Sequence, residues 1–526
     1  MANLFSGKSS LILDKKFEDL QTLRSILGQI GVSEIQVASS VNMALSLLRE
    51  QAVDIFFLNY ELGRDEKNGL QLMFDLQAEG RRLYAACYIL VIEPEKSELL
   101  LGSPENAPDI YISKPYDRVR LSQRIEKLMR LKETLFPIES LLDKRDWEGA
   151  LQACVRHEER YPGLRIYLQR LRGIIYLQQN QAEEARKVFS SLLSGRDKPW
   201  IRIGLAMAAC RSGWFAQARG QLDHVIAQQQ ICIEAFVWRA RIYRLYGDLG
   251  EASNLLRRAT VLQPTVALLR GDLANLAAMT NDTKLAVEAF RAAIKYSRYS
   301  AFQHPDFYFG LVRMLMKHMS ASGSASGDAE EEAVRLLEQA RRDFLDQPVI
   351  HFKSRLLASE IYRSVGDEEQ ANLSASEAMT IYRDLSADEQ AMWLEQLVEG
   401  VEGSSVEGEA HAVRQSLNRN MAKLRWGRAN LKGMMQFRHG ELDEAYASFS
   451  EALQQQPGTP SIALNLVQTV LELCRRSGSD LSRELLAACD EALYSLQFAA
   501  LTPKQQQRYL GLGRRLSEYV RQLEGE

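Results

Sequence analysis

Five polar side chains stand directly after short apolar runs in the N-terminal part of the chain: Asp14, Lys15, Asn59, Glu93 and Lys114. Two carboxylates and two amines in this group balance one another in charge, so they are able to form an internal ion-pair network. Mg²⁺ requires hard oxygen ligands, and the Lys15 ammonium repels a cation. These residue types therefore predict a polar pocket that holds no metal.

The apolar runs that position these residues alternate with stretches of helical period. Branched and aromatic residues predict strands at residues 11–13, 35–38, 55–58, 89–92 and 110–112. Helices are expected at residues 18–31, 42–51, 70–79 and 118–131, with a weak one near 96–101. Five such units predict a parallel, doubly wound α/β sheet, in which a site lies at the carboxyl ends of the strands.

Several residues at these strand ends follow a common pattern of residue type and position. Asp14 follows the first run, Gly69 follows the third, Tyr111 lies in the fifth, and Lys114 precedes Pro115. With this set, residues 8–132 resemble the receiver domain of bacterial response regulators. Receivers carry two magnesium-holding acids after strand one, a phosphoacceptor aspartate after strand three, a threonine or serine after strand four, and a lysine before a proline after strand five.

The sequence departs from the receiver pattern at three positions. Lys15 replaces the second acid, Asn59 replaces the phosphoacceptor, and Glu93 takes the place of the hydroxyl residue. An amide has no anionic oxygen to attack a phosphodonor, so transfer from a histidine kinase should fail. The resemblance therefore implies a receiver fold that works without phosphorylation.

Two interpretations of this pocket stay open. In the first, Glu93 stands where the phosphorylated state is normally sensed and holds one conformation permanently. In the second, the pocket has lost its chemistry and the fold survives as a docking surface. In both, the last strand and helix around Tyr111, Pro115 and Arg118 form the expected switch or interface region.

A different periodicity follows the receiver-like region. Residues 127–136 contain no glycine or serine, which predicts a stiff connection. Alanines then recur at intervals of 35, 33, 34 and 34 residues, at Ala150, Ala185, Ala218, Ala252 and Ala286. This spacing resembles that of tetratricopeptide repeats, whose paired antiparallel helices stack into an all-α superhelix.

The tetratricopeptide resemblance covers residues 133–525, and residues 1–7 are expected to be a tail. Two hydrophilic segments, 320–332 and 399–409, are expected to be mobile loops. Tetratricopeptide arrays bind peptides or helices in the groove formed by the first helix of each pair. The resemblance places nine residues of three repeats in that groove: Tyr167, Arg170, Ile174, Trp200, Ile203, Met207, Val237, Arg241 and Arg244.

Composition and motifs exclude several functions. A net charge of −3, from 65 basic and 68 acidic residues, gives no field for nucleic acid. No apolar run is long enough to cross a membrane and the start resembles no export signal, so we expect a cytoplasmic protein. The six cysteines and seven histidines lack metal-ligand spacing, and the phosphate-loop, dinucleotide, metalloprotease and serine-hydrolase motifs are missing. We therefore expect no enzyme, no metal and no cofactor.

The sequence thus predicts a non-enzymatic signalling adaptor that binds a protein partner in the groove, with the receiver face as a second expected binding surface. A homo-oligomer is compatible with the sequence. The alternative is a ligand-gated regulator that binds a small anion or nucleotide in the vacated receiver pocket or in the groove.

Overall fold

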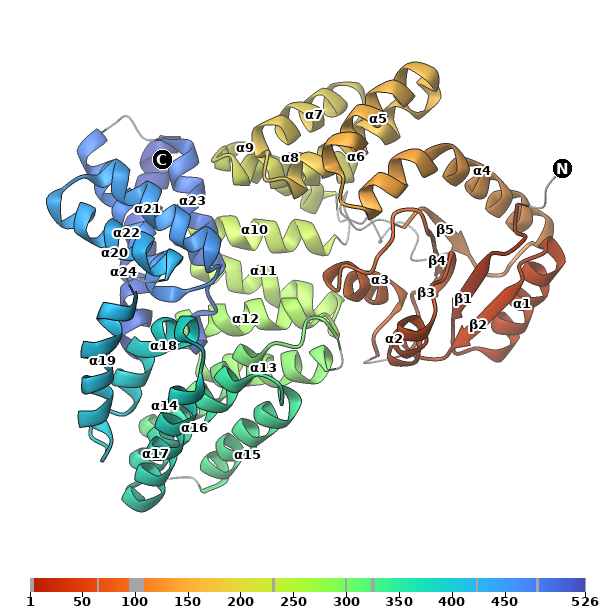
Figure 1. Cartoon of the computed structure of the whole chain (residues 1–526). Helices are drawn as coiled ribbons and strands as arrows, with labels where there is room; N and C mark the ends of the chain where they lie inside the picture. The colour runs from red at the N-terminus through yellow and green to blue at the C-terminus, as the bar shows by residue number, and fades with distance from the viewer. Residues whose placement is uncertain are drawn as a thin grey trace. The chain divides into compact units, whose positions relative to one another are not determined.

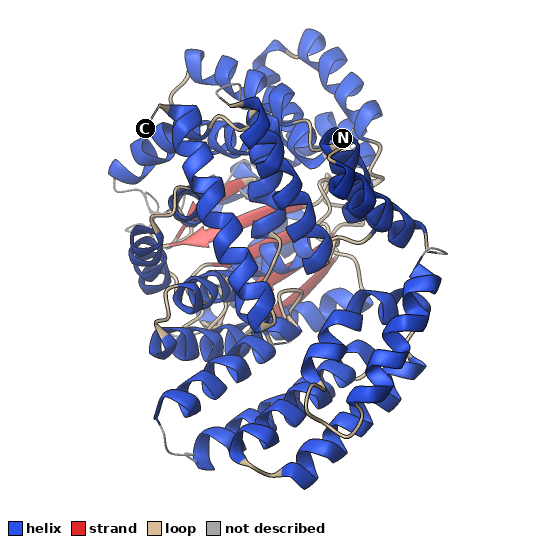
Figure 2. Cartoon of the chain, turned by 90° about the vertical axis from the view of Figure 1, so that its left-hand side faces the viewer, coloured by secondary structure: helices blue, strands red, loops and turns tan. Residues whose placement is uncertain are grey.

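A computed structural model of the chain describes residues 4–63, 66–93, 108–228, 232–298, 300–322, 327–421, 424–478 and 482–525. The strands gather in its N-terminal part, and the remainder is helical (Figures 1 and 2). The weak helix expected near 96–101 lies outside the described residues.

Five parallel strands form the N-terminal sheet in the order β2-β1-β3-β4-β5. All five predicted strands are confirmed, each within a residue or two: β1 Ser9–Leu13, β2 Glu34–Ala38, β3 Ile55–Asn59, β4 Cys87–Ile92 and β5 Ile110–Ser113. Every residue of β3 and β4 is buried, as expected for central strands with helices on both faces. The strand order reverses between β1 and β3, where ligand sites of such sheets lie.

Among the described residues, each face of the sheet is covered by two helices. Side chains of α1 (Phe17–Ile30) and α4 (Arg118–Asp143) share a core with the strand residues of one face. Side chains of α2 (Val41–Glu50) and α3 (Gly69–Ala78) share a second core with those of the other face. Gly69 is required at the start of α3, because a Cβ there would lie 2.6 Å from the Cβ of Leu58.

The helix α4 continues without a break from the sheet into the helical array (Figure 1). Its 26 residues include the whole segment predicted to be a stiff connection, and Pro137 lies inside it. The predicted boundary after residue 132 therefore falls in the middle of a helix.

The rest of the chain is a succession of helices in tetratricopeptide-like antiparallel pairs. The first half contains α5 Trp147–Arg160, α6 Arg165–Gln178, α7 Ala182–Gly195, α8 Pro199–Arg211, α9 Phe215–Ala227, α10 Ile233–Leu245, α11 Leu249–Leu262, α12 Ala267–Met279, α13 Thr283–Ser297 and α14 Pro305–Ser322. The second half contains α15 Gly327–Asp343, α16 Pro348–Val365, α17 Glu368–Asp384, α18 Ala387–Gly400, α19 Glu407–Met421, α20 Arg425–His439, α21 Leu442–Gln455, α22 Pro460–Ser477, α23 Arg483–Tyr494 and α24 Pro503–Glu524. Short 3₁₀ turns, η2 Pro162–Leu164 and η3 Phe498–Ala500, precede α6 and α24.

Small residues and phenylalanine rings set the close approach of paired helices. All five periodic alanines are fully buried. The ring of Phe189 in α7 fills the space beside two glycines, Gly173 and Gly204, where an added Cβ would lie 2.6 Å from the ring. Larger side chains at these places would force the helices apart, which explains why the 34-residue spacing is visible in the sequence.

Two segments expected to be mobile loops are largely ordered secondary structure or packed turns. Residues 320–322 end α14 and residues 327–332 begin α15, while residues 323–326 of this segment lie outside the described residues. Residues 401–406 form a turn between α18 and α19, in which Val401 and Val406 are buried in a hydrophobic cluster. These two valines hold the turn in place, although the glycines and glutamates around them suggested a loop.

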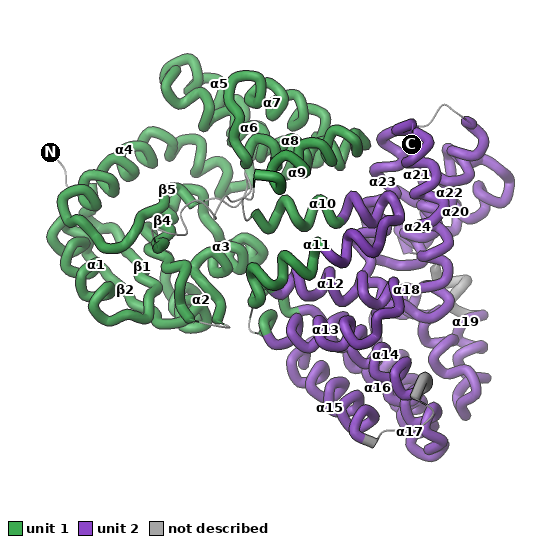
Figure 3. Tube along the Cα trace, turned by 180° about the vertical axis from the view of Figure 1, so that it is seen from behind, with its two compact units in different colours: residues 1–240, 255–266, 296–303 green, residues 241–254, 267–295, 304–526 purple. Residues whose placement is uncertain are grey.

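The chain divides into two compact units (Figure 3). The first contains residues 1–240, 255–266 and 296–303, and the second contains 241–254, 267–295 and 304–526. The sheet and the first repeats thus form one unit, and the chain passes to the other within α10 and α11. This division differs from the one expected at residue 132.

Candidate functional site

The pocket at the carboxyl ends of the strands is closed by an ion-pair triad. Lys114, which follows β5, donates from Nζ to Asp14 Oδ2 at 2.7 Å and to Asp19 Oδ2 at 2.5 Å. Asp14 is 1% exposed, and its other oxygen accepts the backbone N–H of Lys16. The lysine ammonium is therefore already neutralised by two carboxylates, one directly after β1 and one in α1.

The predicted four-residue network is only partly present. Asp14 does pair with Lys114, but Lys15 pairs with Glu66 instead of a pocket acid. Glu93 makes no ion pair or hydrogen bond with any described residue. The prediction missed Asp19, which lies in the first turn of α1, five residues after Asp14, and so reaches the same strand end.

Asn59 lies at the end of β3, and its side chain accepts a hydrogen bond from the backbone of the following turn. It is 3% exposed, and its Oδ1 accepts the N–H of Glu61 at 2.9 Å. An amide in this position closes the turn after the strand and has no carboxylate oxygen for a phosphoryl group.

The residues expected to form a switch or interface lie at the end of the sheet. Tyr111 is half-buried against the core, and its carbonyl accepts a hydrogen bond from Arg124 at 2.8 Å. The peptide bond between Lys114 and Pro115 is cis. Arg118 is exposed and begins α4.

A buried ammonium joins the sheet to the first repeat. Lys132 in α4 donates from Nζ to the Tyr84 carbonyl at 2.7 Å and to Glu139 Oε1 at 2.9 Å, and it lies 3.1 Å from Asp109 Oδ1. Burial alone lowers the pKa of Lys132, but the carboxylates of Asp109 and Glu139 raise it well above its ordinary value. Lys132 is therefore charged, with acceptors before and after it in the chain.

Two predicted groove residues belong to this junction. The Tyr167 hydroxyl donates to Glu139 Oε1 at 3.2 Å. Burial lowers the pKa of Arg170, and the groups around it include Tyr167 and, from the sheet domain, Asp109 and Tyr111. The sequence pattern did not indicate this contact, because one partner lies in the strand-and-helix region and the other in the helical repeats, and each region was predicted separately.

A second contact within the same unit involves α3 and the segment after α11. Gln71 is buried and donates to Thr265 Oγ1 at 2.8 Å, while Gln263 donates to the Tyr60 hydroxyl at 2.9 Å. Burial raises the pKa of Tyr60 to about 12, so this hydroxyl stays neutral. Among the described residues, the sheet domain thus contacts the array around Lys132 and again beside α3, in addition to the covalent connection.

Three apolar residues expected in the groove lie in the core instead. Ile203 is fully buried, and Ile174 and Met207 are at most 5% exposed. The groove prediction is wrong for these residues, because they are buried inside the helical array. Trp200 and Val237 are half-buried, and the Arg170 guanidinium lies 5.2 Å from the Trp200 ring centroid.

The two remaining groove residues are covered by the chain itself. Arg241 in α10 bonds Asp490 Oδ2 and Glu491 Oε2 of α23, both at 2.6 Å, and lies 4.3 Å from the centroid of the Tyr494 ring. Arg244 lies 4.4 Å from the same centroid. Their prediction as exposed anchors is wrong, because α23 packs on this part of α10.

A carboxylate of α12 completes this charged cluster. The Tyr494 hydroxyl donates to Asp272 Oδ2 at 3.2 Å. Burial raises the pKa of Asp272 from 3.8 to about 6, although Arg244, the Tyr494 hydroxyl and Arg241 lower it. The acid therefore changes its charge within the physiological range.

The described residues contain no group of three or more acids, histidines or cysteines that could hold a metal ion. All six cysteines are free thiols in buried positions. Within the described parts of the chain, no helix combines the length and the apolar character needed to cross a membrane.

No protein-family model matches the chain, and no curated protein matches it. A tetratricopeptide repeat protein from Parabacteroides merdae ATCC 43184 is similar over 48% of this chain and 92% of its own, with 17% identity and a TM-score of 0.32. Human IFIT1, solved as a dimer with m7Gppp-AAAA, is similar over 73% of this chain and 90% of its own, with 14% identity and a TM-score of 0.30. Likeness this distant concerns the helical fold and assigns no ligand to this chain.

Replacing the junction lysine should destabilise the first unit strongly. Lys132→Met leaves Glu139 and Asp109 buried without their cation, and breaking such a pair costs about 3–5 kcal/mol. We expect this loss in the free energy of unfolding measured by urea titration. Arg130→Met on the same helix removes an exposed ion pair with Glu126 and should have no measurable effect. Equal stabilities of the two variants would contradict a structural role for the buried ammonium.

Asp272→Asn should change how stability depends on pH. The folded pKa of Asp272 lies above its unfolded value, so its stabilising contribution is complete below about pH 3.8 and is lost as the pH rises through about 6. Relative to the parent, the free energy of unfolding of Asp272→Asn should therefore rise by up to about 2–3 kcal/mol between pH 4 and pH 7. Asp346→Asn, at an exposed position, is the control. Parallel pH profiles for the parent and Asp272→Asn would rule out the raised pKa.

Proposed function

We propose that this protein is a non-enzymatic signalling adaptor, in which a receiver-like domain that accepts no phosphoryl group is joined to a tetratricopeptide-like array that binds a protein partner. The observation that carries the proposal is the triad of Lys114, Asp14 and Asp19. It neutralises, with the chain's own carboxylates, the lysine that the receiver resemblance assigns to the pocket.

Phosphoryl transfer to this pocket lacks its two requirements. The nucleophile would have to be a carboxylate, and Asn59 offers an amide whose oxygen already accepts a backbone hydrogen bond. Magnesium would need several oxygen ligands, but Lys15 stands where the receiver pattern has its second acid, and Asp14 is already bonded to Lys114. These features support a pocket whose conformation is set without phosphorylation.

The partner surface that we propose is the part of the groove around α8. Trp200 and Val237 are the members of the predicted set that are half-buried and whose side chains make no hydrogen bond or ion pair with a described residue. Trp200, stacked with Arg170, offers an aromatic and cationic anchor of the type enriched in interfaces. This pairing favours a protein segment with acidic and apolar side chains.

The receiver pocket gives little support to the alternative of a gated small-anion sensor. Lys114 is neutralised by two carboxylates and Lys15 is paired with Glu66, so each ammonium already has an acidic partner within the chain. Nucleic acid is not proposed as a partner, because the chain carries a net charge of −3.

Incubation with acetyl phosphate and Mg²⁺ should leave the intact mass of the protein unchanged. Asn59→Asp alone should also stay unlabelled, because Lys15 still occupies the position of a metal-holding acid. Mass spectrometry of the intact chain measures both outcomes. The positive control is the double variant Lys15→Asp with Asn59→Asp, which restores both acids of the receiver pattern and tests whether the fold can then be labelled. Labelling of the parent chain that is lost in Asn59→Ala would disprove the proposal.

Partner binding should depend on the groove tryptophan and not on phosphodonor. We expect the tagged chain to retain the same partner from an extract of its source cells with and without acetyl phosphate, and Trp200→Ala to lose most of it, since truncating an aromatic anchor costs about 2 kcal/mol or more. The matched control is Trp214→Ala, whose ring also stacks with an arginine, Arg186, but lies between α8 and α9. Equal retention by both variants would move the partner site away from this groove.

A further inference from the structure

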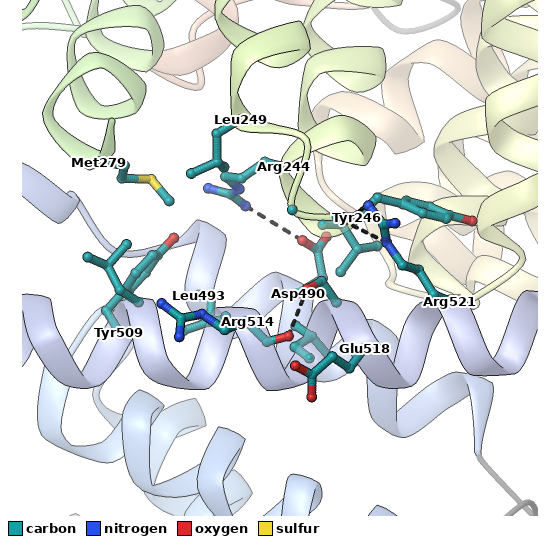
Figure 4. A pocket seen from close by; sticks show the side chains of 16 residues that line it. Arg244, Tyr246, Leu249, Met279, Asp490, Leu493, Tyr509, Arg514, Glu518 and Arg521 are labelled. Atoms are coloured by element: carbon teal, nitrogen blue, oxygen red, sulfur yellow. Dashed lines mark hydrogen bonds and ion pairs between the residues drawn. The ribbon is translucent and has the colours of Figure 1, made fainter. Parts of the chain in front are cut away.

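The second unit contains a cavity of about 530 Å³ between α24 and the turn that joins α10 to α11 (Figure 4). Its walls come from α10, α11, the end of α12, α23 and α24. This volume lies within the range of cavities that hold small organic ligands.

One wall of the cavity carries the guanidinium of Arg244. Its Nη2 is buried and makes no hydrogen bond with any described residue. The nearest carboxylate oxygen, Asp490 Oδ1, is 3.6 Å away, beyond hydrogen-bonding distance (Figure 4). A buried charged donor without an acceptor is costly, so an acceptor from outside the chain would be strongly favoured at this point.

The reason Arg244 lacks an acceptor is that its neighbour takes it. Arg241, one helical turn earlier, bonds the other oxygen of Asp490 at 2.6 Å and also Glu491. The Tyr494 ring lies beside both guanidinium groups and holds them in place, but it offers no anionic oxygen to Arg244. The acceptor deficit is thus built into α10 and α23.

The rest of the cavity is mainly apolar. Leu249, Met279, Leu493 and the buried Tyr509 line it beside Arg244. On α24, Gly513 contributes a gap, because a Cβ there would meet nothing within 4 Å. A ligand in this space would therefore place an apolar body against these side chains.

The charges of the lining limit the ligand to a single negative charge. Arg521 already bonds Asp248 and the Tyr246 carbonyl, and Arg514 and Glu518 are exposed to solvent. Among the lining arginines, this leaves Arg244 as the buried cation with a donor short of an acceptor, which one anionic group satisfies. Nucleotides and other polyphosphates carry more charge and would be repelled by the acids of the lining. A carboxylate matches the planar guanidinium with two parallel hydrogen bonds.

We infer that this cavity binds a small monocarboxylate with an apolar body, whose carboxylate accepts hydrogen bonds from Arg244. The bound molecule would contact both α10 and α24 and so fasten the C-terminal helix to the array. This site is independent of the proposed adaptor function, because it involves neither the receiver-like pocket nor Trp200.

Decanoate is the probe for this site, with 1-decanol as its uncharged counterpart. We expect decanoate to raise the thermal unfolding temperature of the full chain in a saturable way, and decanol to bind at least about tenfold more weakly, as expected for a lost hydrogen bond to a charged group. Arg244→Met should weaken decanoate binding by a similar factor. Isothermal titration gives the affinities.

A pair of glycine variants keeps the test decisive if Arg244→Met fails to fold. Gly513→Leu fills the cavity from α24, whereas Gly511→Leu places the same side chain on the same helix at an exposed position that also has open space. Both replace a helical glycine with a better helix former. We expect decanoate to stabilise the parent and Gly511→Leu and to leave Gly513→Leu unchanged. Equal stabilisation of both leucine variants, or none of the parent, would overturn the inference.

Discussion

The buried ammonium of Lys132 is the interaction on which the first unit depends. An uncompensated charge at this depth would be excluded from a folded protein, so Tyr84, Asp109 and Glu139 must all be in place when α4 packs. Tyr84 and Asp109 belong to the sheet domain, while Glu139 lies beyond it on the same helix. The helix α4 therefore packs together with the sheet domain on one side of Lys132 and with the first repeat on the other. This explains why the first compact unit extends beyond the boundary predicted at residue 132.

Charge compensation within the chain follows the same logic at three other places. Lys114 is neutralised by Asp14 and Asp19, Lys15 by Glu66, and Arg241 by Asp490 and Glu491. In each case the cation lies where a resemblance to a known family suggested an external ligand or partner. Arg244 differs, because the carboxylate nearest to it is already shared. The first three cations are paired with carboxylates of the chain, so they offer nothing to an outside ligand. Arg244, beside the cavity at α24, still has a donor without an acceptor.

The local features were predictable because they repeat or alternate in the sequence. All five strands follow from runs of branched residues, and the helix pairs follow from alanines about one repeat apart, which are fully buried. The groove assignment failed for a different reason. Its register placed Ile203 and Met207 one face away from the core that they occupy, since a helical period leaves neighbouring faces ambiguous.

Contacts between residues far apart in the chain leave no pattern in the local sequence from which they could be predicted. Arg241 and Asp490 are 249 residues apart, and Gln71 and Thr265 are 194 apart. Nothing in the repeat around Arg241 indicates that α23 will cover it, since the same arginine on an open array would be an ordinary groove residue. In the second unit, the face of α10 that carries Arg241 is therefore covered by the chain's own α23, although the repeat pattern alone would leave that face open.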